Sequence, residues 1–367
     1  MLLTAYPAAQ KYLDFEALDL QKFLPGATIF NNGSKKTIGD PLRDLSLLIP
    51  TLFSGIGTLS DKIKVLKLNR LLKKTSLSEI FAKSEKRTLQ YLLDFGFSEE
   101  MISKFFKPFF SGIFLEPKLE TSSRMFEFIY KMFGEGYATL PKAGIEAIPK
   151  QLLQNLKNTT FKFDTKVASI KDGEITLDDN TKLESHFTIV ATDASNLISN
   201  LKNQSTEWRS CHTLYFETES RVIRKQLIGL IPKYGTLINN IFYHTSLDTT
   251  KTPNKELLSV TVIDNQNLSN EILIERVKIE LKEHCDIHSC KFIKQYNIPM
   301  ALPKLEDLQY EILPFETRLT TSLFLAGDTQ LNGSLNAAII SGERAALGVI
   351  ETLSSNISSE SNTSEYR

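Results

Sequence analysis

The spacing of hydrophobic positions indicates a helical region followed by a strand-rich region. Between residues 40 and 137 apolar side chains recur every three or four positions, as in SDKIKVLKLNRLLKK (residues 60–74), which is typical of amphipathic helices. Ser60 and Ser76 stand where N-caps are expected, and Glu79 follows Ser76 at capping-box spacing. We therefore predict a helical subdomain over residues 40–137.

The hydrophobic period changes further along the chain. Residues 160–190 read as short β-rich pieces, with hairpin turns at residues 171–173 and 179–180 and a buried strand in HFTIVATD (residues 186–193). Residues 210–298 contain the strand-like segments SCHTLYFET, TLINNIFYH and LLSVTVID, then an amphipathic helix and a further strand, KFIKQYNIP. The pattern predicts an antiparallel sheet with one helix after it.

Two helical segments are rich in aromatic residues. They are SEEMISKFFKPFF (residues 98–110) and SSRMFEFIYKMFGEG (residues 122–136), each interrupted or ended by proline or glycine. Such stripes usually form a core, but those at residues 105–114 and 126–133 could instead line an apolar tunnel. The sequence leaves both interpretations open.

Composition and charge exclude several classes of protein. The 367 residues include 41% hydrophobic and 23% charged positions, as in ordinary globular proteins. Lys+Arg and Asp+Glu both total 43, so the chain has no net positive charge that would attract nucleic acid. The longest apolar stretch (residues 45–53) is far shorter than the roughly 20 residues of a membrane span, and no basic segment opens a secretory signal. We predict a cytoplasmic protein without a transmembrane segment; peripheral membrane contact and the oligomeric state stay open.

Neither the cysteines nor the first glycine-rich loop indicates a ligand site. Cys211, Cys285 and Cys290 are odd in number, and HCDIHSC (residues 284–290) lacks a second half with zinc-like spacing, so we expect no metal. The loop FSGIGTLSDK (residues 53–62) resembles a phosphate loop only in its G-x-G, and it reads better as a turn before the helix that Ser60 would cap.

A stronger candidate lies near the C-terminus. The apolar strand SLFLA (residues 322–326) is followed by Gly327 and Asp328, at the strand end where open α/β sheets bind ligands. A helix beginning near Gly333 or Ser334 offers unpaired N–H groups and the positive end of its dipole. Its small residues allow close packing against a planar cofactor, although tight helix–sheet packing in any α/β domain explains them too.

The same segment carries a family resemblance. FLAGDTQLNGSLNAAIISGERAA (residues 324–346) resembles the C-terminal flavin-binding segment of the FAD-dependent amine oxidase, phytoene desaturase and protoporphyrinogen oxidase superfamily. Residues 105–152 and 165–195 follow the order found in bacterial phytoene-dehydrogenase-like members.

The resemblance implies FAD as cofactor and a set of binding residues. It implies that the Val167 backbone meets the adenine, that Gly327 and Asp328 meet the ribityl and pyrophosphate region, and that the helix start offers N–H groups to the flavin edge. That start comprises Ser334, Leu335, Asn336 and Ala337. The resemblance implies hydride removal from a C–N or C–C bond of an apolar small molecule, and no catalytic residue emerges.

The family's first strand, its G-x-G-x-x-G turn and its following acidic residue have no counterpart near residue 1. We therefore expect an α/β (mixed α+β) fold with an N-terminally truncated flavin domain and a helical plus antiparallel-sheet substrate domain. An alternative is a non-catalytic remnant acting as a scaffold. The expected organisation is a linking remnant (1–39), helical subdomain (40–137), FAD-binding segment (138–200), substrate sheet (201–314), FAD-binding strand and helix (315–353) and disordered tail (354–367).

Overall fold

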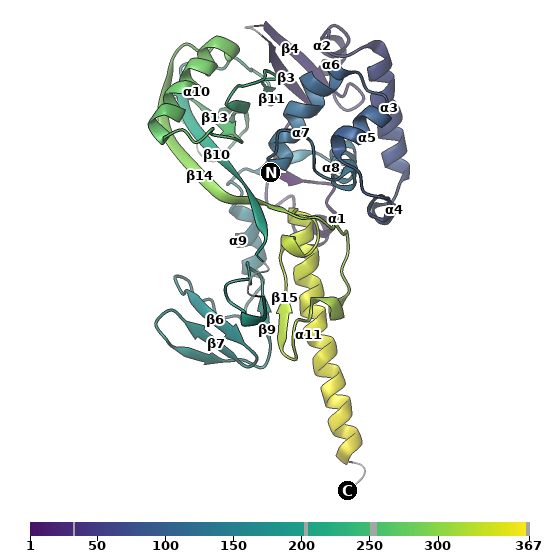
Figure 1. The fold of residues 1–367 in the computed structure, drawn as a ribbon, viewed down its shortest axis with the longest axis vertical. Helices are drawn as coiled ribbons and strands as arrows, with labels where there is room; N and C mark the ends of the chain where they lie inside the picture. The colour runs from purple at the N-terminus through teal and green to yellow at the C-terminus, as the bar shows by residue number, and fades with distance from the viewer. Residues whose placement is uncertain (32–33, 202–204, 250–254, 365–367) are drawn as a thin grey trace. The chain divides into compact units, whose positions relative to one another are not determined.

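The computed structural model describes residues 1–31, 34–201, 205–249 and 255–364, and the chain forms two compact units (Figure 1). Unit 1 comprises residues 1–6, 12–153 and 208–302. Unit 2 comprises residues 7–11, 154–207 and 303–367. Each unit is therefore built from segments that are far apart in the sequence.

A seven-stranded mixed sheet is the centre of unit 1, with strand order β14-β10-β13-β12-β11-β3-β4. The strands are β3 (Gly26–Asn31), β4 (Ser34–Gly39), β10 (Glu207–Thr218), β11 (Ile228–Leu230), β12 (Ile238–Tyr243), β13 (Glu256–Val262) and β14 (Cys290–Lys304). The sequence predicted β10, β12, β13 and β14 and an antiparallel sheet, but it gave no indication of β11. It did not predict that β3 joins β11 in parallel.

The seam between β3 and β11 needs a glycine. A Cβ atom on Gly229 would lie 2.8 Å from Cε2 of Phe30 and 2.7 Å from Cγ1 of Ile241, which is closer than side chains approach. Gly229 therefore allows the large side chains of β3 and β12 to meet across β11.

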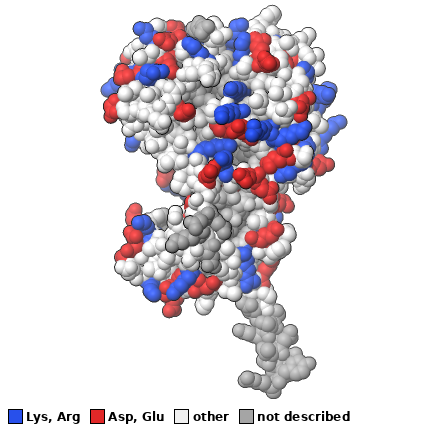
Figure 2. Space-filling model, in the orientation of Figure 1, with Lys and Arg blue, Asp and Glu red and all other residues white. Residues whose placement is uncertain are grey.

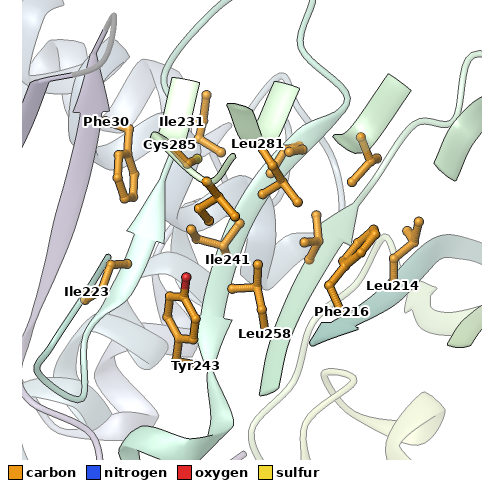
Figure 3. Close-up of a cluster of buried hydrophobic side chains, with 14 of the residues drawn as sticks. Phe30, Leu214, Phe216, Ile223, Ile231, Ile241, Tyr243, Leu258, Leu281 and Cys285 are labelled. Carbon is orange, nitrogen blue, oxygen red and sulfur yellow. The ribbon is translucent and has the colours of Figure 1, made fainter. Parts of the chain in front are cut away.

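One face of this sheet is buried beneath α10 (Asn270–Cys285), which Ser269 caps. Alternate strand residues supply the sheet side of the core, as the period of two requires, and Figure 3 shows them grouped with Leu281 and Cys285 of α10. The helix side consists of Leu273, Val277 and Leu281, which are four residues apart and so lie on one face of α10. The core also takes in Cys285, which is fully buried.

Helices form most of unit 1 between residues 45 and 135. They are α2 (Leu48–Leu52), α3 (Leu59–Lys74), α4 (Leu77–Ala82), α5 (Thr88–Asp94), α6 (Glu99–Met101), α7 (Lys107–Phe114) and α8 (Ser123–Glu135), with a π-helical turn at Ile102–Phe106. The predicted helices and the Ser76–Glu79 capping box are confirmed. The predicted Ser60 cap is wrong: Thr58 caps α3 in a capping box with Asp61, because the chain turns two residues earlier.

The aromatic helices form a core. Five phenylalanines of this part of unit 1 are at most 1% exposed: Phe106, Phe110, Phe114, Phe126 and Phe128. Their rings pack on one another, with Phe110 and Phe126 centroids 4.7 Å apart. For these residues the core interpretation holds. Smaller elements complete unit 1: a sheet of β1 (Leu2–Leu3), β5 (Ala138–Pro141) and β2 (Leu20–Lys22), and α9 (Ala147–Gln154).

Unit 2 contains a meander and a parallel strand pair. The meander is β6 (Val167–Lys171), β7 (Glu174–Leu177) and β8 (Lys182–Glu184), and both predicted hairpin turns are confirmed, with Gly173 and Asn180 at positive φ. The parallel pair is β9 (Thr188–Val190) and β15 (Leu323–Leu325). Ile170, Val190 and Leu323 share one core between the two sheets.

Helix α11 (Leu335–Ser364) ends unit 2. Disorder was predicted from residue 354, whereas the structure continues the helix to Ser364; residues 365–367 lie outside the described residues. Hydroxyl groups near residue 354 bond to backbone carbonyls one turn earlier, as Ser354 Oγ does to the Ile350 oxygen at 2.9 Å. Such bonds satisfy the serine hydroxyl within the helix, although they do not by themselves favour helix over other conformations.

Candidate functional site

The candidate site begins where the two parallel strands of unit 2 end. The Ala326 N–H donates to the Val190 carbonyl at 2.9 Å, so the pairing of β15 with β9 continues one residue past β15. The loops after the strands, beginning at residues 191 and 327, leave the same edge of the pair. This is the edge at which open α/β sheets place their ligands.

Gly327 turns the chain out of β15 in a conformation that favours glycine. Its φ is 128° and its ψ is 164°, and its N–H donates to Ser341 Oγ of α11 at 2.9 Å. A Cβ atom here would meet only Thr329 Oγ1, at 3.7 Å. The glycine therefore leaves room for a ligand to approach the backbone.

Asp328 follows with a half-buried carboxylate. Burial raises the pKa of Asp328 above its usual value, and backbone N–H groups at Asp328 and Thr329 counter that rise. Among the described residues, no basic side chain forms an ion pair with it. Its backbone oxygen accepts from Gly333 N at 3.0 Å, which folds the loop back toward α11. The carboxylate thus remains available to accept hydrogen bonds from hydroxyl groups.

The first turn of α11 supplies donors beside this loop. Ser334 is its cap: Ser334 Oγ accepts from Ala337 N at 3.0 Å and donates to Asn332 Oδ1 at 2.7 Å. In the hydrogen-bond network of the described chain, the N–H groups of Leu335 and Asn336 have no acceptor, as the start of a helix leaves them. They lie at the positive end of the helix dipole and suit an electron-rich ligand.

Asn336 has a structural contact that the sequence did not suggest. Its side chain is fully buried, and its Oδ1 accepts from Ala8 N at 3.0 Å. Ala8 belongs to α1 (Pro7–Tyr12), of which residues 7–11 belong to unit 2. The backbone of Asn336 is thus offered to a ligand while its side chain fixes α1 to α11.

Val167 lies apart from the other six predicted residues. It is the first residue of β6, pairs with Leu177, and packs on the core that Val190 and Leu323 share. No hydrogen bond in the described part of the chain joins it to the loop after β15 or to the start of α11. The structure therefore brings Gly327, Asp328 and the start of α11 together, whereas Val167 shares a core only with β9, β15 and the segments beside them.

Sequence reasoning missed Asp172, which holds the meander to β15. Its Oδ1 accepts from Ser322 N at 3.0 Å and Ser322 Oγ at 2.6 Å, and from the hydroxyl groups of Thr320 and Thr321. The hydroxyl of Ser322 is the largest cause that lowers the pKa of Asp172. The turn Lys171-Asp172-Gly173 was recognised only as a turn; the run TTS before the strand is the signal that could have indicated a partner.

We expect Asp172→Ala to destabilise unit 2 at neutral pH by about 1 kcal/mol, because the carboxylate is solvent-exposed and its hydrogen bonds are screened. Because the pKa of Asp172 is lower in the folded state, the carboxylate stabilises the fold at pH values above its unfolded-state pKa. This stabilisation is lost as the pH falls through the folded-state pKa. Urea unfolding should therefore separate variant from wild type at pH 7 and bring them together in strong acid. Asp172→Asn, which keeps an acceptor, should lie between them, and a difference that persists in acid would contradict the account.

The residues present fit FAD on their own geometry. Gly327 leaves its backbone open to a ligand, the Asp328 carboxylate has no basic partner among the described residues, and the start of α11 offers N–H groups. Such a set suits a ligand with hydroxyl groups and an electron-rich edge. The fold and this arrangement are compatible with a flavoprotein.

The chain matches the family described as flavin containing amine oxidoreductase over residues 2–350, and it belongs to that family. It is an FAD-dependent oxidoreductase, as the resemblance implied. No curated protein matches the chain. The described part of the chain contains no group of acidic, histidine and cysteine side chains that could hold a metal ion, and no helix there is long and apolar enough to cross a membrane.

Solved structures share the fold. An oxidoreductase from Methanosarcina mazei is 16% identical, with a TM-score of 0.64, covering 92% of this chain and 84% of that one. A putative protoporphyrinogen oxidase from Exiguobacterium sp. 255-15 is 14% identical, with a TM-score of 0.62 and coverage of 96% and 86%. Cyclohexylamine oxidase from Brevibacterium oxydans is 10% identical, with a TM-score of 0.63 and coverage of 96% and 86%. The predicted mixed fold is confirmed.

Proposed function

We propose that unit 2 holds FAD at the edge formed by Gly327, Asp328 and the start of α11, and that the enzyme removes hydride from a C–N or C–C bond of an apolar small molecule. The observation that carries the cofactor site is the open backbone at Gly327 beside an uncompensated carboxylate and unpaired helix N–H groups. FAD supplies the hydride acceptor when bound.

The residues have distinct roles in this proposal. The Asp328 carboxylate accepts hydrogen bonds from ribityl hydroxyl groups near the pyrophosphate, beside Gly327. Within the turn Ser334 to Ala337, the unpaired backbone N–H groups of Leu335 and Asn336 face the electron-rich edge, where the helix dipole favours negative charge. The Val167 backbone meets the adenine. No residue of the chain is assigned to proton transfer.

Replacing Asp328 tests the cofactor site. Asp328→Ala should weaken FAD binding by about 1.5–3 kcal/mol, since it removes a charge-assisted acceptor. Asp328→Asn keeps one oxygen acceptor at the same volume and should weaken binding less. Flavin titration followed by fluorescence measures both, and circular dichroism checks the fold. Wild-type affinity in the alanine variant would reject Asp328 as a ligand.

Colour distinguishes the enzyme from the scaffold alternative, which the family membership does not favour. Purified chain with flavin absorbance near about 450 nm supports an FAD-bound enzyme, because a scaffold has no need to retain a cofactor. A colourless preparation that cannot be reconstituted with added FAD would contradict the proposal.

We also propose the setting in which the enzyme works. Cys211 and Cys285 are buried as free thiols, which suits a reducing, cytoplasmic environment. Basic and acidic side chains are interspersed on the face that Figure 2 shows, in keeping with a partner that is not nucleic acid. An apolar substrate dissolves in lipid, so we propose peripheral membrane contact.

A further inference from the structure

Unit 1 carries a concentration of exposed apolar side chains between residues 42 and 66. We call this set the apolar ridge; its nine members are Leu42, Leu45, Leu48, Ile49, Leu52, Phe53, Leu59, Ile63 and Leu66. Each is more than 40% exposed, and Phe53 reaches 82% and Leu45 81%. Single exposed apolar residues are common, but a continuous set of this size marks an interaction surface.

One hydrogen bond joins the two helices, α2 and α3, that carry or border seven members of the ridge. Lys62 Nζ donates to the Leu52 carbonyl at 2.9 Å, which ties the first turn of α3 to the end of α2. Gly55 and Gly57, both at positive φ, turn the chain between them. The exposed side chains at the end of α2 and the start of α3 therefore lie on neighbouring turns of backbone.

The orientation of α3 is fixed from its buried side. The Asp61 carboxylate is buried and accepts from Ser98 N at 2.9 Å and Ser98 Oγ at 2.7 Å, which anchors the first turn. Leu68 and Leu72 are buried on the same side. Leu59, Ile63 and Leu66, at helical spacing on the opposite side, must then face outward.

Basic side chains accompany the ridge. Residues 42–74 contain seven lysines and arginines but only two acidic residues, Asp44 and Asp61, although the whole chain has no net charge. With Asp44 and Asp61 counted, the segment still has five more basic than acidic side chains. Arg70, Lys73 and Lys74 are exposed and continue the outward side of α3 beyond Leu66. Apolar tips flanked by lysine and arginine are typical of surfaces that lie in a membrane interface.

We propose that the apolar ridge docks on an anionic membrane surface, with its leucines and Phe53 entering the boundary between headgroups and acyl chains. The proposal rests on the peripheral membrane contact proposed above, and it names the surface and the lipid charge. The basic side chains beside the ridge complement a negatively charged surface, which a second copy of this neutral chain does not present in the same region. An anionic bilayer offers acyl chains to the apolar ridge and negatively charged headgroups to the basic side chains beside it.

Vesicle flotation with the full chain tests the proposal. Wild type should float with vesicles of equal parts phosphatidylcholine and phosphatidylglycerol, and less with phosphatidylcholine alone. The triple variant Ile49→Ser, Phe53→Ser, Leu59→Ser should lose about tenfold or more of the bound fraction. A matched control, Tyr234→Ser, Leu313→Ser, Phe315→Ser, removes exposed apolar surface elsewhere and should float like wild type. Arg70→Gln, Lys73→Gln, Lys74→Gln should lose the preference for the anionic vesicles.

Each contrary outcome has a definite meaning. A wild type that does not float overturns membrane docking. A serine triple variant that floats like wild type moves the contact away from the ridge. If wild type sediments as a dimer and the serine variant as a monomer, the ridge binds a second copy instead. Circular dichroism checks folding, and flavin absorbance reports on the cofactor proposal independently of all these results.

Discussion

Glu280→Ala is expected to lower the free energy of unfolding by about 3–5 kcal/mol. The Glu280 carboxylate is 5% exposed and accepts from Leu237 N at 3.0 and 2.9 Å and from Ile238 N at 3.0 Å. Alanine would leave both backbone N–H groups buried without an acceptor where β12 begins beneath α10. Urea unfolding followed by circular dichroism measures the loss.

Two further variants give this prediction its controls. Glu280→Gln keeps one oxygen acceptor at nearly the same volume, so it should lose clearly less stability than alanine. Glu275 is exposed on the outer side of α10, so Glu275→Ala should change the free energy of unfolding by less than about 0.5 kcal/mol. A Glu280→Ala protein as stable as wild type would show that water or a rearranged strand satisfies the two N–H groups.

Phe126→Ala is expected to cost a similar amount, about 3–5 kcal/mol, because it opens a cavity in the aromatic core of unit 1. Phe126 is fully buried, and its ring centroid lies 4.7 Å from that of Phe110 and 5.5 Å from those of Tyr91 and Tyr130. Thermal and urea unfolding of the purified variant measure the effect.

The same experiment separates a core from a tunnel. If the ring lined an open apolar tunnel, its replacement by alanine would lower the free energy of unfolding much less, because solvent or substrate already contacts one side of the ring. Phe133→Ala is the matched control. Phe133 is only half-buried, so its replacement should lower the free energy of unfolding by less. A small loss at Phe126 with altered flavin reduction by substrate would favour the tunnel instead.

Local signals predicted much of the fold. The hairpin turns of the meander carry glycine and asparagine at positive φ, and the capping box of α4 is a short-range pattern, so both could be read directly. The alternation in β10, β12 and β13 likewise reports which side chains face α10. The parallel pairing of β3 with β11 has no such signal, because nothing within β3 specifies a partner two hundred residues away.

The candidate site shows the same division. Gly327, Asp328 and the Ser334 cap are contiguous enough to be recognised as a strand, a turn and a helix start. Asp172 and the Asn336 side chain act through partners 150 and 328 residues distant, so their roles emerge only once the chain has folded. Sequence patterns therefore locate a ligand-binding edge better than they locate the contacts that hold it in place.

The parallel seam between β3 and β11 has a consequence for biosynthesis. A ribosome releases β3 long before it has made residues 228–230, so until then the β3–β4 hairpin has Ala27, Thr28 and Ile29 without their β11 partners on one edge. Long-range closure of this kind slows folding and leaves nascent chains open to misassembly. The outer edge of β3 therefore stays open to wrong strand pairing until β11 is made, and closing it requires contact across about two hundred residues.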